Sequence, residues 1–267
     1  MKTEIQSTSY KQYWQISKAL MRADLKVLLA HIKGKLIDAS IWGALSLYVM
    51  TYLMPSSGLI NFGPFQAPTI IIGVIGFEIY TQTFLLTMEI EKRSHLFYLF
   101  TLPIPRSVVF LQKTIFYTLN GAIIGLTMIP LTKLILLDQI NFANLAWCKL
   151  LMTIFASSFL FSGFLLIMVS LVKTTRNVDH VFMRVLFPMW FLGGFQFSWG
   201  MLHKIHPALS YVALLSPYTY AHEAARSSML GSAGFLPFWI CTLVLFVGGI
   251  SLGMIGYYRL KKYIDLA

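Results

Sequence analysis

The chain has 267 residues, of which 57% are hydrophobic and 12% are charged, whereas a soluble domain carries about 25% charged residues. Its mean hydropathy of +0.70 and its apolar runs of about 20 residues indicate one polytopic membrane domain and exclude an ordinary soluble fold. The net charge of +11 does not indicate nucleic-acid binding, because the basic residues flank apolar runs instead of forming an aromatic-interleaved patch.

The N-terminal segment, residues 1–36, is predicted to be cytoplasmic and to contain an amphipathic helix over residues 9–36. Apolar and aromatic residues recur there every three or four positions, from Tyr10 to Ile32, opposite a stripe of Lys and Arg. We expect such a helix to lie along the inner membrane surface. Packing of the same helix against the rest of the protein is the alternative.

Six membrane spans are predicted within residues 37–257, each near the roughly 17–25 residues that a hydrocarbon core of about 30 Å requires. They are Ile37–Met54, Thr69–Met88, Val108–Ile129, Leu150–Val172, Val181–Trp199 and Phe235–Tyr257. With the N-terminus in the cytoplasm, 17 of the 21 Lys and Arg residues fall on the inner side. The fold class expected is therefore an all-α integral membrane protein with six transmembrane helices, both termini and the basic tail 258–267 being cytoplasmic.

An inner loop is predicted at residues 89–107, between the second and third spans. Its middle, His95–Leu102, is apolar and aromatic, but charges flank it and Pro103 and Pro105 follow it. We expect a short helix at the inner surface, suited to a groove on a cytoplasmic partner. The chain has no GxxxxGK[ST] phosphate-binding loop, so the ATP and magnesium of any ATP-driven process belong to another chain.

The stretch Gly193–Gly231 is apolar but is broken by prolines, and we expect it to include a re-entrant helical hairpin at residues 201–230, on the outer side. Its second half is predicted to be a short helix that Ser216 caps, Pro217 begins and Gly231 ends.

Several polar and aromatic side chains are candidates for a pathway or gate. Glu78, near the middle of the second span, either lines a pathway or ties helices together, since an ionised side chain there costs roughly 2.5–3.5 kcal/mol. Glu223 and Arg226 either pair along their helix or contact a substrate. Three aromatic residues belong either to an interfacial aromatic belt or to the lining of an exit path: Phe195, Trp199 and Tyr218. His222 is a further gate candidate, and the alternative for it is a histidine at the membrane boundary that is hydrogen-bonded to water or backbone.

Two chemical sites are weaker interpretations. His203 and His206 lack a zinc-site spacing such as HExxH, and Ser227 and Ser228, near His222, lack a GxSxG context. No catalytic, cofactor-binding or metal-binding residue is therefore assigned.

The order of these elements resembles the membrane subunit of type-2 ATP-binding-cassette (ABC) exporters. Two local patterns carry the resemblance: EKRSHLFYLFTLPIPRSVVFLQK at 91–113, which is similar to the family's inner loop, and SPYTYAHEAARSSML at 216–230, which is similar to its pattern after the hairpin. The chain departs from the family where Ser94 and His95 replace a frequent Gly-Thr.

The resemblance implies a dimer of membrane subunits, either two copies of this chain or this chain and a homologous permease, driven by two cytoplasmic ABC ATPase subunits. It makes the N-terminal helix an interface helix and the hairpin an outer gate. It also implies a coupling helix, held by the ATPase, whose residues are Arg93, His95, Leu96, Phe97, Tyr98 and Leu99.

The function expected is the permease subunit of an exporter in a bacterial inner (plasma) membrane, surrounded by lipid. Alternating access would move an amphipathic substrate outward, whether lipid-like, glycan-linked or drug-like. An ion-gradient-driven secondary transporter with Glu78 as its proton site is the first alternative. An intramembrane lipid-modifying enzyme that depends on His222 is the second.

Overall fold

A computed structural model describes residues 10–93, 95–102, 104–142, 145–172 and 174–266, and within these residues the chain is helical and contains no strand. Among the described residues, five helices are long and apolar enough to cross a membrane. They are α1 (Tyr10–Tyr48, extended by the π-turn Val49–Leu53 and by α2, Met54–Ser56), α3 (Gly63–Glu91), α5 (Arg106–Leu136), α6 (Trp147–Leu171) and α12 (Phe238–Leu266).

Short helices connect these spans. The helix α4 (His95–Thr101) lies between α3 and α5, and a 3-10 turn (Leu137–Gln139) follows α5. After α6, a second 3-10 turn (Thr175–Asn177) leads into α7 (Val178–Val181), a π-turn (Phe182–Leu186) and α8 (Phe187–Leu192). The remaining short helices are α9 (Trp199–Ile205), α10 (Pro207–Ala213) and α11 (Pro217–Met229).

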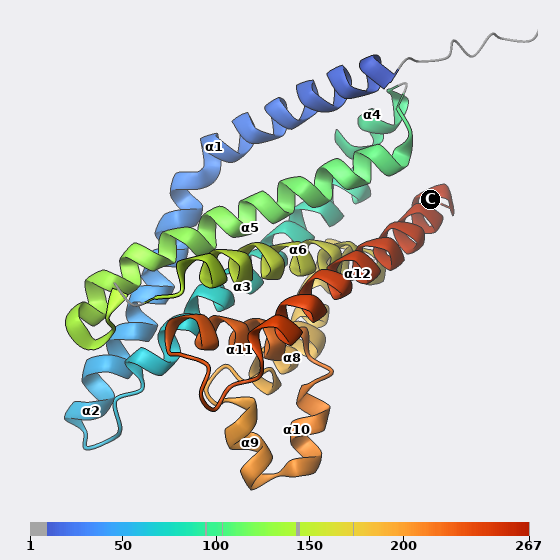
Figure 1. Cartoon of the computed structure of the whole chain (residues 1–267). Helices are drawn as coiled ribbons and strands as arrows, with labels where there is room; N and C mark the ends of the chain where they lie inside the picture. Colours follow the sequence, from blue (N-terminus) through green and yellow to red (C-terminus); the bar gives the residue numbers. More distant parts are fainter. Residues whose placement is uncertain (1–9, 94, 103, 143–144, 173, 267) are drawn as a thin grey trace, which may run out of the picture.

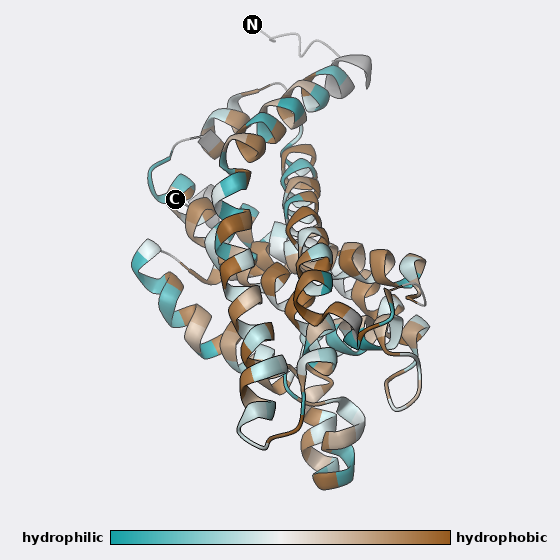
Figure 2. Cartoon of the chain, turned by 90° about the vertical axis from the view of Figure 1, so that its left-hand side faces the viewer, coloured by the Kyte–Doolittle hydropathy of each residue, from teal (hydrophilic) through white to brown (hydrophobic). Residues whose placement is uncertain are grey.

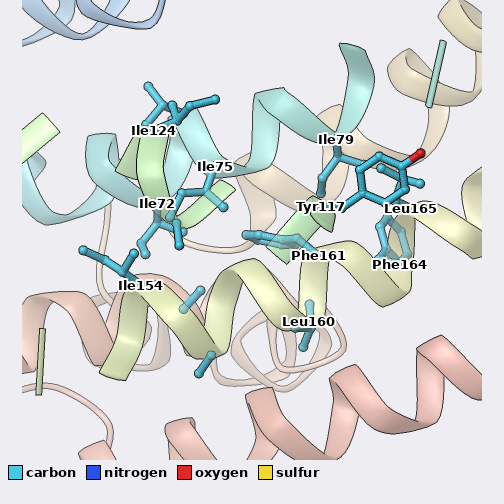
Figure 3. Close-up of a cluster of buried hydrophobic side chains, with 14 of the residues drawn as sticks. Ile72, Ile75, Ile79, Tyr117, Ile124, Ile154, Leu160, Phe161, Phe164 and Leu165 are labelled. Atoms are coloured by element: carbon cyan, nitrogen blue, oxygen red, sulfur yellow. The ribbon is translucent and has the colours of Figure 1, made fainter. Parts of the chain in front are cut away.

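Helix α3 lies at the centre of the bundle, in contact with α1, α5, α6 and α11. Side chains at helical spacing, such as Ile72, Ile75 and Ile79 of α3, meet Ile124 of α5 and Phe161 of α6 in one apolar core (Figure 3). Burial of this kind does not drive helix association inside lipid, so close packing has to hold the helices together.

The closest helix crossing joins α6 to α12 and depends on glycine. A Cβ atom added at Gly163 would lie 2.7 Å from the backbone oxygen of Gly249 and 2.8 Å from the backbone nitrogen of Gly253. Because both of these are backbone atoms, no side chain can move aside to make room. Gly249 and Gly253 of α12 therefore pack closely against α6.

The structure has no helix break at the predicted boundary between the N-terminal helix and the first span, because α1 runs through residue 36 as one helix. Leu28, in the segment expected to lie flat on the membrane, is 3% exposed. Asp24 of the same segment is held by Lys113 of α5. This part of α1 therefore packs against the bundle. Hydrophilic residues alternate with apolar ones along it (Figure 2).

The predicted fifth span, Val181–Trp199, is not one continuous helix. The helical segment begins at Val178 and ends at Leu192, because Gly193 and Gly194 form a turn in which Gly194 has a φ of +81°. At 15 residues this segment is shorter than a usual span. The six-span count therefore remains a prediction.

The two ends of the bundle differ. Helix α4 and the start of α1 lie at one end, whereas α9 and α10 project as a hairpin from the opposite end (Figure 1). Ile205, Tyr211 and Leu215 of the hairpin segment are 77%, 61% and 81% exposed. We call these the α4 end and the hairpin end.

Candidate functional site

Helix α4 is built as predicted at His95–Leu102, but its side chains divide into two sets. Leu96 and Leu99 are 0% and 1% exposed and belong to the apolar core, whereas Tyr98 is 61% exposed. A helix that buries two leucines in its own bundle can present only the opposite side to a partner. Among the α4 side chains that the structure describes at the predicted coupling positions, Tyr98 is the exposed one, and Arg93 before the helix is exposed as well.

The remaining predicted coupling residues support α4 or lie beside it. Arg93, in the turn before α4 with a φ of 48°, places its guanidinium 5.9 Å from the ring of Phe97, which is half-buried. Arg106 at the start of α5 holds Phe100 in a similar way, at 5.3 Å. His95 begins the helix, but its side chain lies outside the described part of the chain.

A second contact at the α4 end was not predicted. Glu91, the last residue of α3, accepts a hydrogen bond of 3.0 Å from the backbone amide of Thr175, and Tyr80 donates one of 2.5 Å to Asp179. These bonds join the end of α3, at Glu91, and its middle, at Tyr80, to the segment that follows α6. The connection KTTRNVDH is short and polar, and nothing in its sequence indicates which element it meets.

Arg226 of α11 is completely buried and binds backbone carbonyls of the turn that ends α8. Its guanidinium donates to the oxygens of Gly194 at 2.6 Å, Phe197 at 2.8 Å and Phe195 at 3.2 Å. The same group lies 4.1 Å from the ring centroid of Phe65. If α8 were longer, these carbonyls would form hydrogen bonds within the helix. Arg226 satisfies them instead, which explains why the helical part of the predicted fifth span ends early.

Glu223 of α11 holds the chain on both sides of the hairpin. Its Oε1 accepts a hydrogen bond from the backbone amide of Trp199 at 2.9 Å, and its Oε2 accepts one from the amide of Leu236, also at 2.9 Å. Glu223 and Arg226 also form the predicted pair, at 3.4 Å. Both side chains form hydrogen bonds with backbone groups and thereby stabilise the base of the hairpin.

His222 and the adjacent serines do not form a nucleophile–base arrangement. The Nδ1 of His222 lies 2.9 Å from the carbonyl of Gly193, and the hydroxyls of Ser227 and Ser228 donate to carbonyls of their own helix. Among the described residues, neither hydroxyl is hydrogen-bonded to His222. The geometry therefore gives no support to the intramembrane enzyme.

Of the three aromatic gate candidates, Phe195 and Tyr218 are buried and Trp199 is partly exposed. Phe195 is 6% exposed and stacks on Trp190 with ring centroids 4.0 Å apart, and Tyr218 is 2% exposed beside Phe161. Trp199 joins the two arms of the hairpin, because its Nε1 donates to the carbonyl of Ser210 at 2.9 Å. These residues shape the base of the hairpin and do not form an exposed belt.

The prediction for Ser216 is partly wrong. It stands at the N-cap of α11 before Pro217, but its hydroxyl donates to the carbonyl of Met189 at 2.6 Å and caps nothing. Gly231 follows the end of α11 with a φ of +95°, a conformation that suits glycine. In the structure, Ser216 therefore ties α11 to α8.

Glu78 is the centre of a polar cluster between three helices. Its Oε1 accepts hydrogen bonds from Lys35 of α1 at 2.5 Å, Gln82 of α3 at 2.6 Å and Asn120 of α5 at 2.7 Å. The contact with Lys35 is an ion pair whose side chains are 18% and 12% exposed. The arrangement therefore supports the interpretation in which Glu78 ties helices together, while its position beside an open groove leaves a pathway role available.

That groove lies between α1 and α3 and has a volume of about 260 Å³. Its lining includes Lys35, Asp38, Trp42, Phe77 and Glu78. A second groove of about 310 Å³ adjoins it toward the α4 end and shares Lys35 with it. The sequence predicted neither groove, because α1 was divided between a surface helix and a span.

The comparison with known families decides the class of the protein. The sequence profile described as ABC-2 type transporter matches residues 8–230, which cover α1 to the end of α11. The chain belongs to the ABC-2 type transporter family. A search of curated proteins finds no match.

The family and the apolar helices together make this ABC-2 protein a multi-pass membrane protein and the membrane domain of an ABC transporter permease. Permeases of this family are not generally catalytic themselves and normally work with an ATPase subunit. The resemblance found in the inner loop and in the segment after the hairpin is thereby confirmed at the level of the family.

Proposed function

We propose that this chain is the permease subunit of an ATP-driven exporter of a bacterial inner membrane, with both termini in the cytoplasm. It works as a pair of permeases, either two copies or this chain with a homologue, on two cytoplasmic ABC ATPase subunits that hold ATP and magnesium. Alternating access moves an amphipathic substrate outward.

The observation that carries this proposal is the placement of α4. It is anchored by Leu96 and Leu99, leaves Tyr98 exposed, and lies at the end of the bundle opposite the hairpin. A rigidly anchored helix transmits a push from a partner into α3 and α5, between which it is inserted. The segment that contains Thr175 and Asp179 is hydrogen-bonded to α3, and it gives the partner a second route into the bundle.

This proposal needs one crossing beyond the five long helices, and it corresponds to the predicted fifth span. It consists of α7, the π-turn, α8 and the segment up to the hairpin. The helical part is short, so the extended residues that follow Leu192 must lie at membrane depth. Such backbone is tolerated there only where protein satisfies it, and Arg226 supplies donors to three of its carbonyls.

Substitution of Tyr98 by Asp tests the proposal, with Tyr211 as its matched control. Both tyrosines are 61% exposed, Tyr98 at the α4 end and Tyr211 on the hairpin. The wild-type chain and Tyr211→Asp should co-purify with the ATPase, and Tyr98→Asp should lose it while remaining folded. Equal recovery of the ATPase with both variants would mean that α4 is not the docking element.

A further inference from the structure

The groove between α1 and α3 contains a carboxylate without a partner. Asp38 is exposed on α1, and in the described part of the chain no hydrogen bond or ion pair reaches it. Lys35, one turn away, is committed to Glu78. With Lys35 and Glu78 cancelling each other, the groove has a net charge of about −1 from Asp38.

The depth of Asp38 follows from two contacts between α1 and α3. Lys35 meets Glu78, and Thr51, after α1, packs on Gly63 at the other end of α3, so the two helices are antiparallel. Glu78 is 15 residues from Gly63 and 13 from Glu91, or about 22 and 20 Å at 1.5 Å per residue. Asp38 is one turn from that midpoint, where an unpaired charge is costly.

The walls of the groove are aromatic on one side. Trp42 lies one turn beyond Asp38 on α1, and its ring is 5.0 Å from that of Phe77. Behind them Trp190 and Phe195 lie 6.3 and 6.4 Å from Trp42. A single anionic group beside aromatic faces is the combination that attracts an organic cation with apolar substituents.

We infer that this groove is the binding site for the cationic group of an amphipathic, organic-cation cargo. The carboxylate of Asp38 pairs with the positive charge, and Trp42 and Phe77 cover the apolar body. Lys35 holds Glu78 in place and prevents the second carboxylate from competing. The inference rests on the proposed function, because it identifies the substrate class of the permease.

The test uses two probes of one shape and opposite charge, tetraphenylphosphonium and tetraphenylborate. Their binding to the purified chain in lipid nanodiscs, without ATPase, is measured by isothermal titration calorimetry, with empty nanodiscs subtracted. Wild type should bind the phosphonium at least about 10-fold more tightly than the borate, a preference worth about 1.4 kcal/mol.

The variant Asp38→Asn keeps the size of the side chain and removes its charge. It should weaken phosphonium binding about 10-fold and leave borate binding unchanged or stronger. Trp42→Leu should weaken phosphonium binding roughly 2- to 5-fold. The control Asp179→Asn, which is outside the lining of the groove, should bind both probes as wild type does.

Equal binding of both probes to wild type, or an unchanged affinity of Asp38→Asn, would overturn the inference. A third result would also overturn it. If Asp38→Asn alters the oligomeric state while the affinity for the phosphonium stays constant, the carboxylate belongs to a contact between copies of the chain.

The binding test and the ATPase test of the proposed function are independent, because the binding test contains no ATPase. A negative result in either one leaves the result of the other unchanged.

Discussion

Lys35 Nζ lies 2.5 Å from Glu78 Oε1, so a cation from the segment predicted to rest on the membrane surface neutralises the carboxylate at the middle of α3. The pair joins α1 to α3, and Asn120 extends the cluster to α5. Removing one member of the pair leaves the other charge without a counter-ion, whereas removing both members leaves no unpaired charge.

The first prediction follows from this pair. Glu78→Gln and Lys35→Met should each lower the free energy of unfolding by about 1–3 kcal/mol, less than for a fully buried pair because the groove admits water. The double variant should be more stable than either single variant. A double variant whose loss equals the sum of the single losses would show that the two side chains act independently.

Stability is measurable through a natural reporter. Cys241 is buried and Cys148 is exposed, so in a Cys148→Ser background a thiol-reactive dye labels Cys241 only when the protein opens. Thermal midpoints of labelling in detergent then compare the variants under identical conditions.

The second prediction concerns Arg226. Because its guanidinium satisfies three carbonyls and it is completely buried, Arg226→Met should destabilise the protein by about 3–5 kcal/mol. Arg226→Lys should rescue little, since an ammonium group cannot reproduce the planar fork of donors. The exposed Lys204→Met on the hairpin is the control and should melt as wild type. A melting midpoint of Arg226→Met equal to that of wild type contradicts the role assigned to the side chain.

The third prediction concerns the crossing of α6 and α12. Gly163→Ala places a methyl group against backbone atoms of α12 and should cost about 1–3 kcal/mol. Gly34→Ala is the control, because no atom lies within 4 Å of its added Cβ, and it should stabilise helix α1 by about 0.5–1 kcal/mol. If both glycines tolerate alanine equally, the close approach of the two helices is wrong.

Much of the fold follows from the apolar pattern. The second, third, fourth and last predicted spans each coincide with one long helix, and α4 begins at the predicted His95. These elements are predictable because apolar length and proline positions are local properties of the sequence.

Two features could not be predicted, because they depend on contacts between residues distant in the sequence. Lys35 lies near the end of the predicted surface helix, and nothing in that segment indicates that its ammonium group binds Glu78, 43 residues further along the chain. The early end of α8 depends on Arg226, which lies 32 residues after Gly194. No periodicity in one segment reveals a partner in another.

The candidate site shows the same division. Residue types at 216–230 predicted a polar short helix, and the Glu223–Arg226 pair is present. Their principal partners are backbone groups of Gly194, Trp199 and Leu236. Contacts with backbone groups cannot be predicted from residue types, because every residue has the same backbone groups.

The most direct measurement of the central claim is site-specific photo-crosslinking from α4. A photoreactive amino acid introduced in place of Tyr98 should crosslink to the ATPase subunit on illumination of membranes, whereas the same group in place of the equally exposed Tyr211 should not. Crosslinking to the ATPase from Tyr211, or from neither position while the two proteins still co-purify, would contradict the assignment of α4 as the coupling helix.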